Sequence, residues 1–142
     1  MAAFRSHEEL DAWKLCWQLK ERVFAFTATP PASHDFKFCN QIRSASCSAC
    51  DRLAEGFCRY YTREFARFCS MTLGSLGEIK SQLRHARQRE YVSETDFDEI
   101  WGLASRASAT TTGLLKYLLR SPIRGGSFDG PGNHDRKGKR RT

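Results

Sequence analysis

Long apolar stretches are absent from this sequence: no run of about 18 consecutive apolar residues occurs in its 142 residues. A helix needs a run of that length to cross a bilayer, so the sequence predicts no membrane span. The first ten residues, MAAFRSHEEL, contain no apolar core of the kind that defines a signal peptide. We therefore expect a cytoplasmic protein.

Patterns that support catalysis or metal binding are absent too. No glutamate is followed three residues later by a histidine, which excludes the Glu-x-x-His motif of dimetal helix bundles. No His-Glu-x-x-His zinc motif, nucleophile elbow or phosphate-binding loop occurs. Four of the six cysteines, Cys39, Cys47, Cys50 and Cys58, fall on about one face of an expected helix, where they cannot surround a metal ion. These absences predict a protein with no enzymatic activity, metal or cofactor, and they favour reduced cysteines that pack in a core.

Turn and capping signals divide residues 1–120 into four expected helices. Ser6 and Glu9 match a capping box before the first helix, which should end near Ala28 because two prolines follow. The other three helices are expected from Ser33 or Asp35 to about Arg59, from Thr62 to about Arg89, and from Ser93 to about Arg120. Short connections predict an all-α, antiparallel up-down-up-down four-helix bundle. Residues 121–142 are rich in glycine, proline and charge, and they predict a disordered basic tail.

Apolar and small residues recur at spacings of three and four along the last two helices, as is typical of near-antiparallel helix packing. The predicted seam of the third helix is Phe65, Cys69, Thr72, Leu76, Ile79, Leu83 and Ala86, and that of the fourth is Phe97, Trp101, Ala104, Ser108, Thr111, Leu115 and Leu118. Gly74 and Gly77 in the third helix are expected to let another helix approach closely.

The first helix has two apolar faces. One carries Leu10, Trp13, Trp17 and Phe24, and the other carries Leu15, Leu19, Val23 and Phe26. A helix at the edge of a bundle needs one such face, so the second predicts burial between subunits, unless some of these residues are singly exposed. We assign Leu15, Leu19, Val23 and Phe26 to the interface of a homo-oligomer.

The formal net charge of +7 is unevenly distributed. Residues 35–90 carry ten basic and six acidic side chains, and residues 121–142 carry six and two. The rest of the chain is close to neutral. This excess fits either an acidic partner, most often nucleic acid, or a basic surface without a partner.

Arginines and tyrosines concentrate at the turn between the second and third helices. Guanidinium groups bind phosphates through paired hydrogen bonds, and tyrosines can stack on bases. The competing interpretation is ion pairing of these arginines with Glu55 and Glu64. A second, looser group with Lys80 lies further along the third helix. The predicted nucleic-acid-binding residues are Arg52, Arg59, Tyr60, Arg63, Arg67, Arg84 and Arg87.

Three stretches resemble the bacterial four-helix-bundle proteins named for intervening sequences in large-subunit ribosomal RNA genes. They are FRSHEELDAWKLCWQL, QIRSASCSACDRLAEGFCR and REFARFCSMTLGSLGEIKSQL, and the resemblance covers roughly residues 4–120. Its most specific elements are AEG, the following EF-x-x-F, and LGSL-x-E. Relatives often read Ile-Pro-Ser-Asn where this chain reads Ala49, Cys50, Asp51 and Arg52, so we expect a straighter second helix here.

The resemblance implies a bundle that assembles as a ring, with a homopentamer expected. Relatives include the accessory variability determinant of diversity-generating retroelements, a basic ring that binds nucleic acid and a reverse transcriptase. We therefore expect a non-enzymatic, oligomeric bundle that binds nucleic acid, with RNA as the expected form, largely without sequence specificity. The alternative is a scaffold ring whose partner is another protein, for example a reverse transcriptase.

Overall fold

The computed structural model describes residues 4–120, which are helical and contain no strand. Its elements are η1 (His7–Glu9), α1 (Asp11–Thr27), η2 (Ala32–His34), α2 (Phe36–Phe57), α3 (Thr62–Gln88) and α4 (Glu94–Leu119). The all-helical prediction and its four long helices are confirmed. No helix in this range combines the length and apolar character that a bilayer span requires. The basic tail predicted at 121–142 lies outside the described residues.

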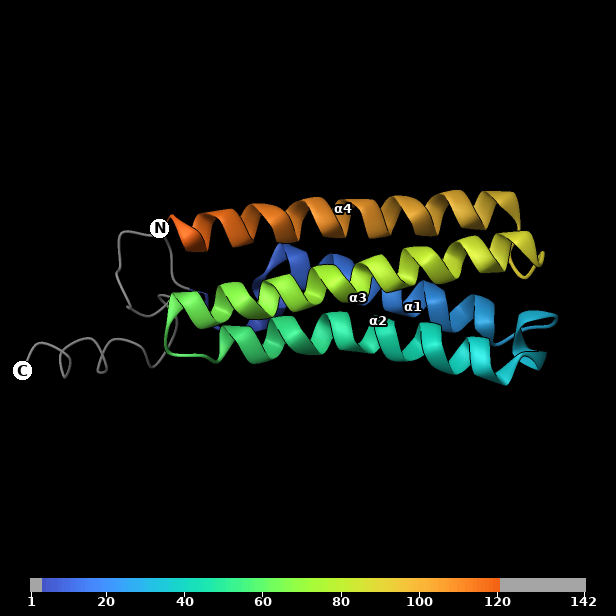
Figure 1. The fold of residues 1–142 in the computed structure, drawn as a ribbon, viewed down its shortest axis with the longest axis horizontal. Helices are drawn as coiled ribbons and strands as arrows, with labels where there is room; N and C mark the ends of the chain where they lie inside the picture. The colour runs from blue at the N-terminus through green and yellow to red at the C-terminus, as the bar shows by residue number, and fades with distance from the viewer. Residues whose placement is uncertain (1–3, 121–142) are drawn as a thin grey trace, which may run out of the picture.

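The four α-helices lie side by side, and the chain reverses direction at each of the three connections (Figure 1). α2 packs on α3, α3 packs on α4, and α1 packs on both α2 and α4. One end of the bundle therefore holds the connection between α2 and α3, and we call it the α2–α3 end. The other end, the α3–α4 end, holds the connection between α3 and α4 together with the one between α1 and α2.

Two helices are capped by the side chains that the sequence predicts. Asp35 accepts a hydrogen bond from the Phe38 N–H at 3.1 Å and starts α2. Ser93 accepts one from the Asp96 N–H at 3.1 Å and starts α4. α2 then runs unbroken to Phe57, through positions 49–52.

The capping predictions for α1 and α3 are wrong. Ser6 accepts from the Glu8 N–H and caps η1, because Leu10 is extended and α1 begins only after it. Glu9 accepts from the Arg5 N–H at 2.6 Å instead of reaching back to Ser6. At α3, Thr62 is the first helical residue and is buried, and the residue before it makes no side-chain cap.

The core follows the predicted seam of α3, in which all seven residues are buried. On α4 the buried face differs from the prediction. Trp101, Ser108 and Leu115 are only half-buried, while Ile100, Leu103 and Ala107 take inner positions. The reason is that α4 packs against both α3 and α1, so its buried face is wider than one seam and is turned toward α1.

The structure contradicts three of the four residues predicted at a subunit interface on α1, namely Leu19, Val23 and Phe26. Leu19 and Val23 have no exposed surface, Phe26 is 9% exposed, and Leu15 is half-buried against the core. Side chains enclosed by their own protomer cannot contact another subunit. This face of α1 is instead the one that packs on α2 and α4, and the face that carries Trp17 is outward.

Gly56, near the end of α2, allows α2 and α3 to approach closely. A Cβ at this position would lie 2.8 Å from Phe65 Cδ1 and 2.8 Å from Phe68 Cβ. A Cβ at Gly74 or Gly77 would meet no atom within 4 Å. The close approach predicted at Gly74 and Gly77 is therefore wrong within the protomer, because both lie on the outward face of α3.

Candidate nucleic-acid interface

The residues predicted to bind nucleic acid are not gathered in one place. Arg59, Tyr60, Arg63 and Arg67 lie at the α2–α3 end, whereas Arg84 and Arg87 lie in the last turns of α3. Seventeen residues of one helix separate positions 67 and 84, which is about 25 Å at 1.5 Å per residue. The structure thus divides the predicted site into two groups, and Arg52, in the last turns of α2, belongs to neither.

The connection cluster consists of Arg59, Arg63 and Arg67. Arg59 follows the end of α2, and the other two are one turn apart in the first turns of α3. The Cζ atoms of Arg59 and Arg67 lie 4.7 Å and 5.8 Å from the centroid of the Phe68 ring. A ring face attracts a cation without neutralising it, so both guanidinium groups are oriented and keep their charge.

No carboxylate neutralises this cluster in the described part of the chain. None of its three arginines is in an ion pair there. Glu55, which could have paired with Arg59, instead pairs with Arg52 in the last turns of α2. Tyr60 is half-buried, with its ring centroid 4.8 Å from that of Tyr61. The cluster therefore keeps three positive charges at one end of the bundle.

The distal cluster consists of Lys80, Arg84 and Arg87 on the α4 side of α3. Lys80 Nζ and Arg84 Cζ lie 4.8 Å and 4.7 Å from the centroid of the Trp101 ring. Arg87 Cζ lies 4.7 Å from the Phe97 ring, which stacks on Trp101 with centroids 5.5 Å apart. Arg87 also pairs with Glu94 at 3.2 Å, an exposed contact that is worth little and is screened by salt. Lys80 is not among the residues predicted to bind nucleic acid, although it belongs to the looser group noted in the third helix.

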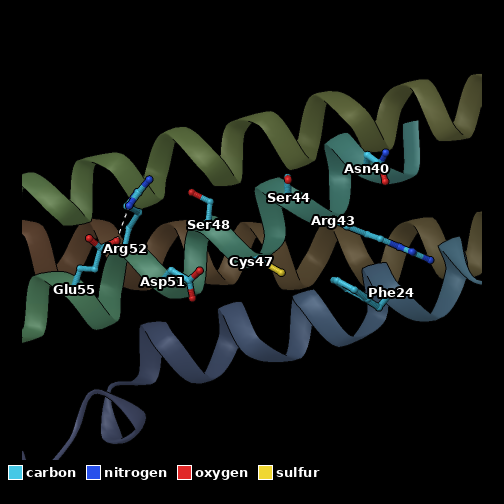
Figure 2. Close-up of a pocket in the computed structure, with 9 residues that line it drawn as sticks. All are labelled: Phe24, Asn40, Arg43, Ser44, Cys47, Ser48, Asp51, Arg52 and Glu55. Atoms are coloured by element: carbon cyan, nitrogen blue, oxygen red, sulfur yellow. Dashed lines mark hydrogen bonds and ion pairs between the residues drawn. The ribbon is translucent and has the colours of Figure 1, made fainter. Parts of the chain in front are cut away.

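A groove of about 530 Å³ runs along the outward side of α2, next to α1 (Figure 2). It is lined by Phe24, Asn40, Arg43, Ser44, Cys47, Ser48, Asp51, Arg52 and Glu55. Figure 2 shows Arg43 extending toward Phe24 and Arg52 reaching Glu55 at the opposite end.

The charges of this groove are balanced, and both of its arginines are already engaged. Arg43 Nε donates to Thr27 Oγ1 at 2.8 Å, and its Cζ lies 5.1 Å from the Phe24 ring. Arg52 is paired with Glu55, and Asp51 supplies a second carboxylate. Two guanidinium groups against two carboxylates leave no excess charge for a polyanion. Arg52 therefore differs from the arginines of the connection cluster, which lack acidic partners.

The cysteines give no sign of metal or redox chemistry. Burial raises the pKa of Cys50 and of Cys69 to about 12, so both thiols stay protonated near neutral pH. Cys47 is half-exposed in the groove, and Cys58 is exposed at the end of α2, so the core position predicted for Cys58 is wrong. Within residues 4–120, no three His, Cys, Asp or Glu side chains converge in a way that could hold a metal ion.

Comparison with family models gives a match over most of the chain. A family model described as 23S rRNA-intervening sequence protein matches residues 8–113, a range that includes both cationic clusters and the whole of α1, α2 and α3. A search of curated proteins finds no match to the chain.

Proposed function

Since the chain belongs to the 23S rRNA-intervening sequence protein family, we propose that it is a non-enzymatic, oligomeric, antiparallel four-helix bundle that binds nucleic acid in the cytoplasm. The family description refers to ribosomal RNA, and RNA is therefore the ligand that we name first. Binding would be largely independent of sequence, because it would use phosphates instead of base edges.

The connection cluster is the observation that carries this proposal. Arg59, Arg63 and Arg67 bring three cations to one end of the bundle without a carboxylate partner in the described chain. Phe68 orients two of them. Because arginine binds phosphate through paired N–H groups, such a cluster suits a polyanion better than a neutral partner.

Outward apolar residues support assembly into an oligomer. Trp17 and Phe24 on α1 are each 39% exposed, and Tyr117 on α4 is 41% exposed. Between positions 101 and 119, α4 carries only two charged residues, Arg106 and Lys116. We place subunit contacts on these surfaces of α1 and α4, and we expect a homopentamer. Assembly would bring several connection clusters together and raise affinity through multivalency.

Filter retention of RNA tests the binding proposal. The variant Arg59→Gln/Arg63→Gln/Arg67→Gln removes the connection cluster, and Lys14→Gln/Lys37→Gln/Arg106→Gln removes the same charge from exposed positions elsewhere. We expect an affinity loss of about tenfold or more for the first variant and only a few-fold for the second, with steep salt dependence for the wild type. Equal losses, or no retention at low salt, would overturn the proposal.

Light scattering tests the oligomer separately. A mass several times that of the 16.2 kDa chain is expected. The mass of a single chain at every concentration would rule out the oligomeric part of the proposal. Replacing Trp17 and Phe24 by serine should shift the assembly toward the protomer, whereas Ser44→Ala, on the outward side of α2, should not.

The groove of Figure 2 favours a second candidate function, a scaffold ring that binds another protein such as a reverse transcriptase. Its balanced charge and mixed polar and apolar lining suit a protein surface better than nucleic acid. An intact oligomer that retains no RNA at low salt would favour this candidate.

A further inference from the structure

Both cationic clusters use α3, and their positions on that helix can be compared directly. The midpoint between Arg63 and Arg67 lies about 28 Å along the axis from Arg84. With 3.6 residues per turn, Arg63 and Arg67 point away from the bundle, whereas Lys80 and Arg87 are turned toward α4. A line that joins the clusters therefore crosses the exposed side of α3 obliquely.

The aromatic rings beneath these cations are covered by them. Phe68 and Phe97 are 6% and 4% exposed, and the face of Trp101 has Lys80 and Arg84 within 5 Å of its centroid. Binding of single strands typically depends on bases that stack on open ring faces. Here the rings instead hold the cations outward, which favours contact with the phosphates of a strand whose bases are already paired.

The surface between the clusters is formed by small residues. Ser70, Gly74, Gly77 and Ser81 follow the outward face of α3, and a Cβ added at either glycine would meet nothing within 4 Å. Glu78 is exposed beside this stretch and would oppose a polyanion. A straight, rod-shaped polyanion could therefore lie across α3 and reach both clusters, and only the carboxylate of Glu78 beside this stretch would repel it.

We propose, resting on the proposed function, that the exposed side of α3 docks double-helical nucleic acid and that both clusters hold its phosphates at once. Their axial separation of about 28 Å, to which the offset around α3 adds, is comparable to one turn of a duplex, which is about 34–36 Å in B-form DNA. Backbone ridges of a duplex recur with that period, so one rod can meet both clusters.

Hairpin RNAs with the same loop and stems of 6 or 16 base pairs test this arrangement. A stem of about 16 base pairs spans two successive minor grooves, whereas a stem of 6 base pairs is too short to reach both clusters. Affinity is measured between about 50 and 200 mM salt. We expect a log–log salt slope of about −5 for the long stem, when six cations engage, and about −3 for the short stem.

The variant Lys80→Gln/Arg84→Gln/Arg87→Gln gives the matched comparison. It should lower the slope of the long stem to about that of the short stem and weaken long-stem binding at least about tenfold. Short-stem binding should fall only about twofold, because the connection cluster remains. The variant Lys80→Arg/Arg87→Lys keeps the charge and should therefore retain the long-stem slope of the wild type. Circular dichroism of each variant checks that the helices are intact.

The outcomes separate this inference from the function on which it rests. Equal slopes for both stems, or a single strand of the same length that binds more tightly than the long stem, would overturn duplex docking and leave RNA binding in place. A slope that depends on stem length only when the distal cluster is present supports docking. No retention of any RNA at low salt would overturn both proposals.

Discussion

The two ends of the bundle differ in how they use charge. At the α3–α4 end, arginines are paired with carboxylates: Arg22 with Asp96 and Glu99 at 3.3 and 3.0 Å, Arg87 with Glu94 at 3.2 Å, and Arg89 with Asp35 at 3.7 Å. At the α2–α3 end, the three arginines of the connection cluster form no ion pair within the described residues. A count of arginines alone would make the ends look alike.

The contacts that close each end differ in the same way. Asp35 caps α2 and also accepts a hydrogen bond from the Tyr91 hydroxyl at 2.8 Å, which ties two connections together. The α2–α3 end is closed by packing, with Phe65 and Phe68 against Gly56. The α3–α4 end is therefore held partly by ion pairs and hydrogen bonds to carboxylates, whereas the α2–α3 end is held by packing and leaves its three arginines without ion pairs within residues 4–120.

Gly56→Ala tests the packed end. An added Cβ would lie 2.8 Å from two phenylalanine side chains, and we expect such overpacking to cost about 1–3 kcal/mol of unfolding free energy. Gly74→Ala is the matched control, because the same change in open space should stabilise the helix by up to about 1 kcal/mol. Urea unfolding of both variants measures the difference. Two changes of the same sign would contradict the role of Gly56.

The α2–α3 contact also shows what sequence reasoning could and could not find. The seam of α3 was predictable because its outer positions are polar or small, so the 4-3 spacing singles out one face. The role of Gly56 was not, since it depends on the register of α2 against α3. A glycine near the end of a helix indicates by itself only a weaker helix.

Two errors have equally physical causes. α1 is apolar on both sides, and a pattern of spacing cannot say which side faces inward, so Leu19 and Val23 were assigned to the wrong surface. The second helix was predicted to run to about Arg59, and the competing interpretation of a Glu55–Arg59 pair depended on that length. α2 ends at Phe57, so Arg59 lies beyond the helical register and Glu55 pairs with Arg52 instead. The contacts of Lys80 and Arg84 with Trp101 join two helices and carry no local signal.

Asp35→Ala tests the end that is closed by charge. The hydrogen bond from the Phe38 N–H, followed by that from the Tyr91 hydroxyl, holds the pKa of Asp35 below its ordinary value. A carboxyl whose pKa is lowered by folding stabilises the protein above its unfolded pKa of about 3.9, and this stabilisation is lost as the pH falls through the folded pKa. The variant should therefore melt at a lower temperature at pH 7. The gap to the wild type should narrow below about pH 4. A gap that is independent of pH would show that the charge of Asp35 does not matter.

Arg22→Gln tests the ion pairs on the surface of the same end. Arg22 and its two partners are 37–54% exposed, so we expect a loss of only about 0.2–1 kcal/mol, and a smaller loss in high salt. Arg106→Gln, which removes an exposed arginine with no ion pair in the described chain, should change stability less. RNA retention by Arg22→Gln should match that of Arg106→Gln. A selective loss of RNA binding in Arg22→Gln would contradict the assignment of Arg22 to stability alone.

Ser70→Glu introduces a carboxylate that can pair with an arginine of the connection cluster. Position 70 is exposed and lies one turn after Arg67, so the new side chain can pair with that arginine. Stability should change by no more than about 0.2–0.5 kcal/mol, the usual value of such a pair on a helix surface. RNA retention should nevertheless fall, and the log–log salt slope should lose about one unit, because one cation of the connection cluster is neutralised. Ser44→Glu adds the same charge to an exposed position on α2 and should leave the slope almost unchanged. If both variants retain RNA equally well, free arginines are not what distinguishes this end, and the contrast between the two ends would concern stability alone.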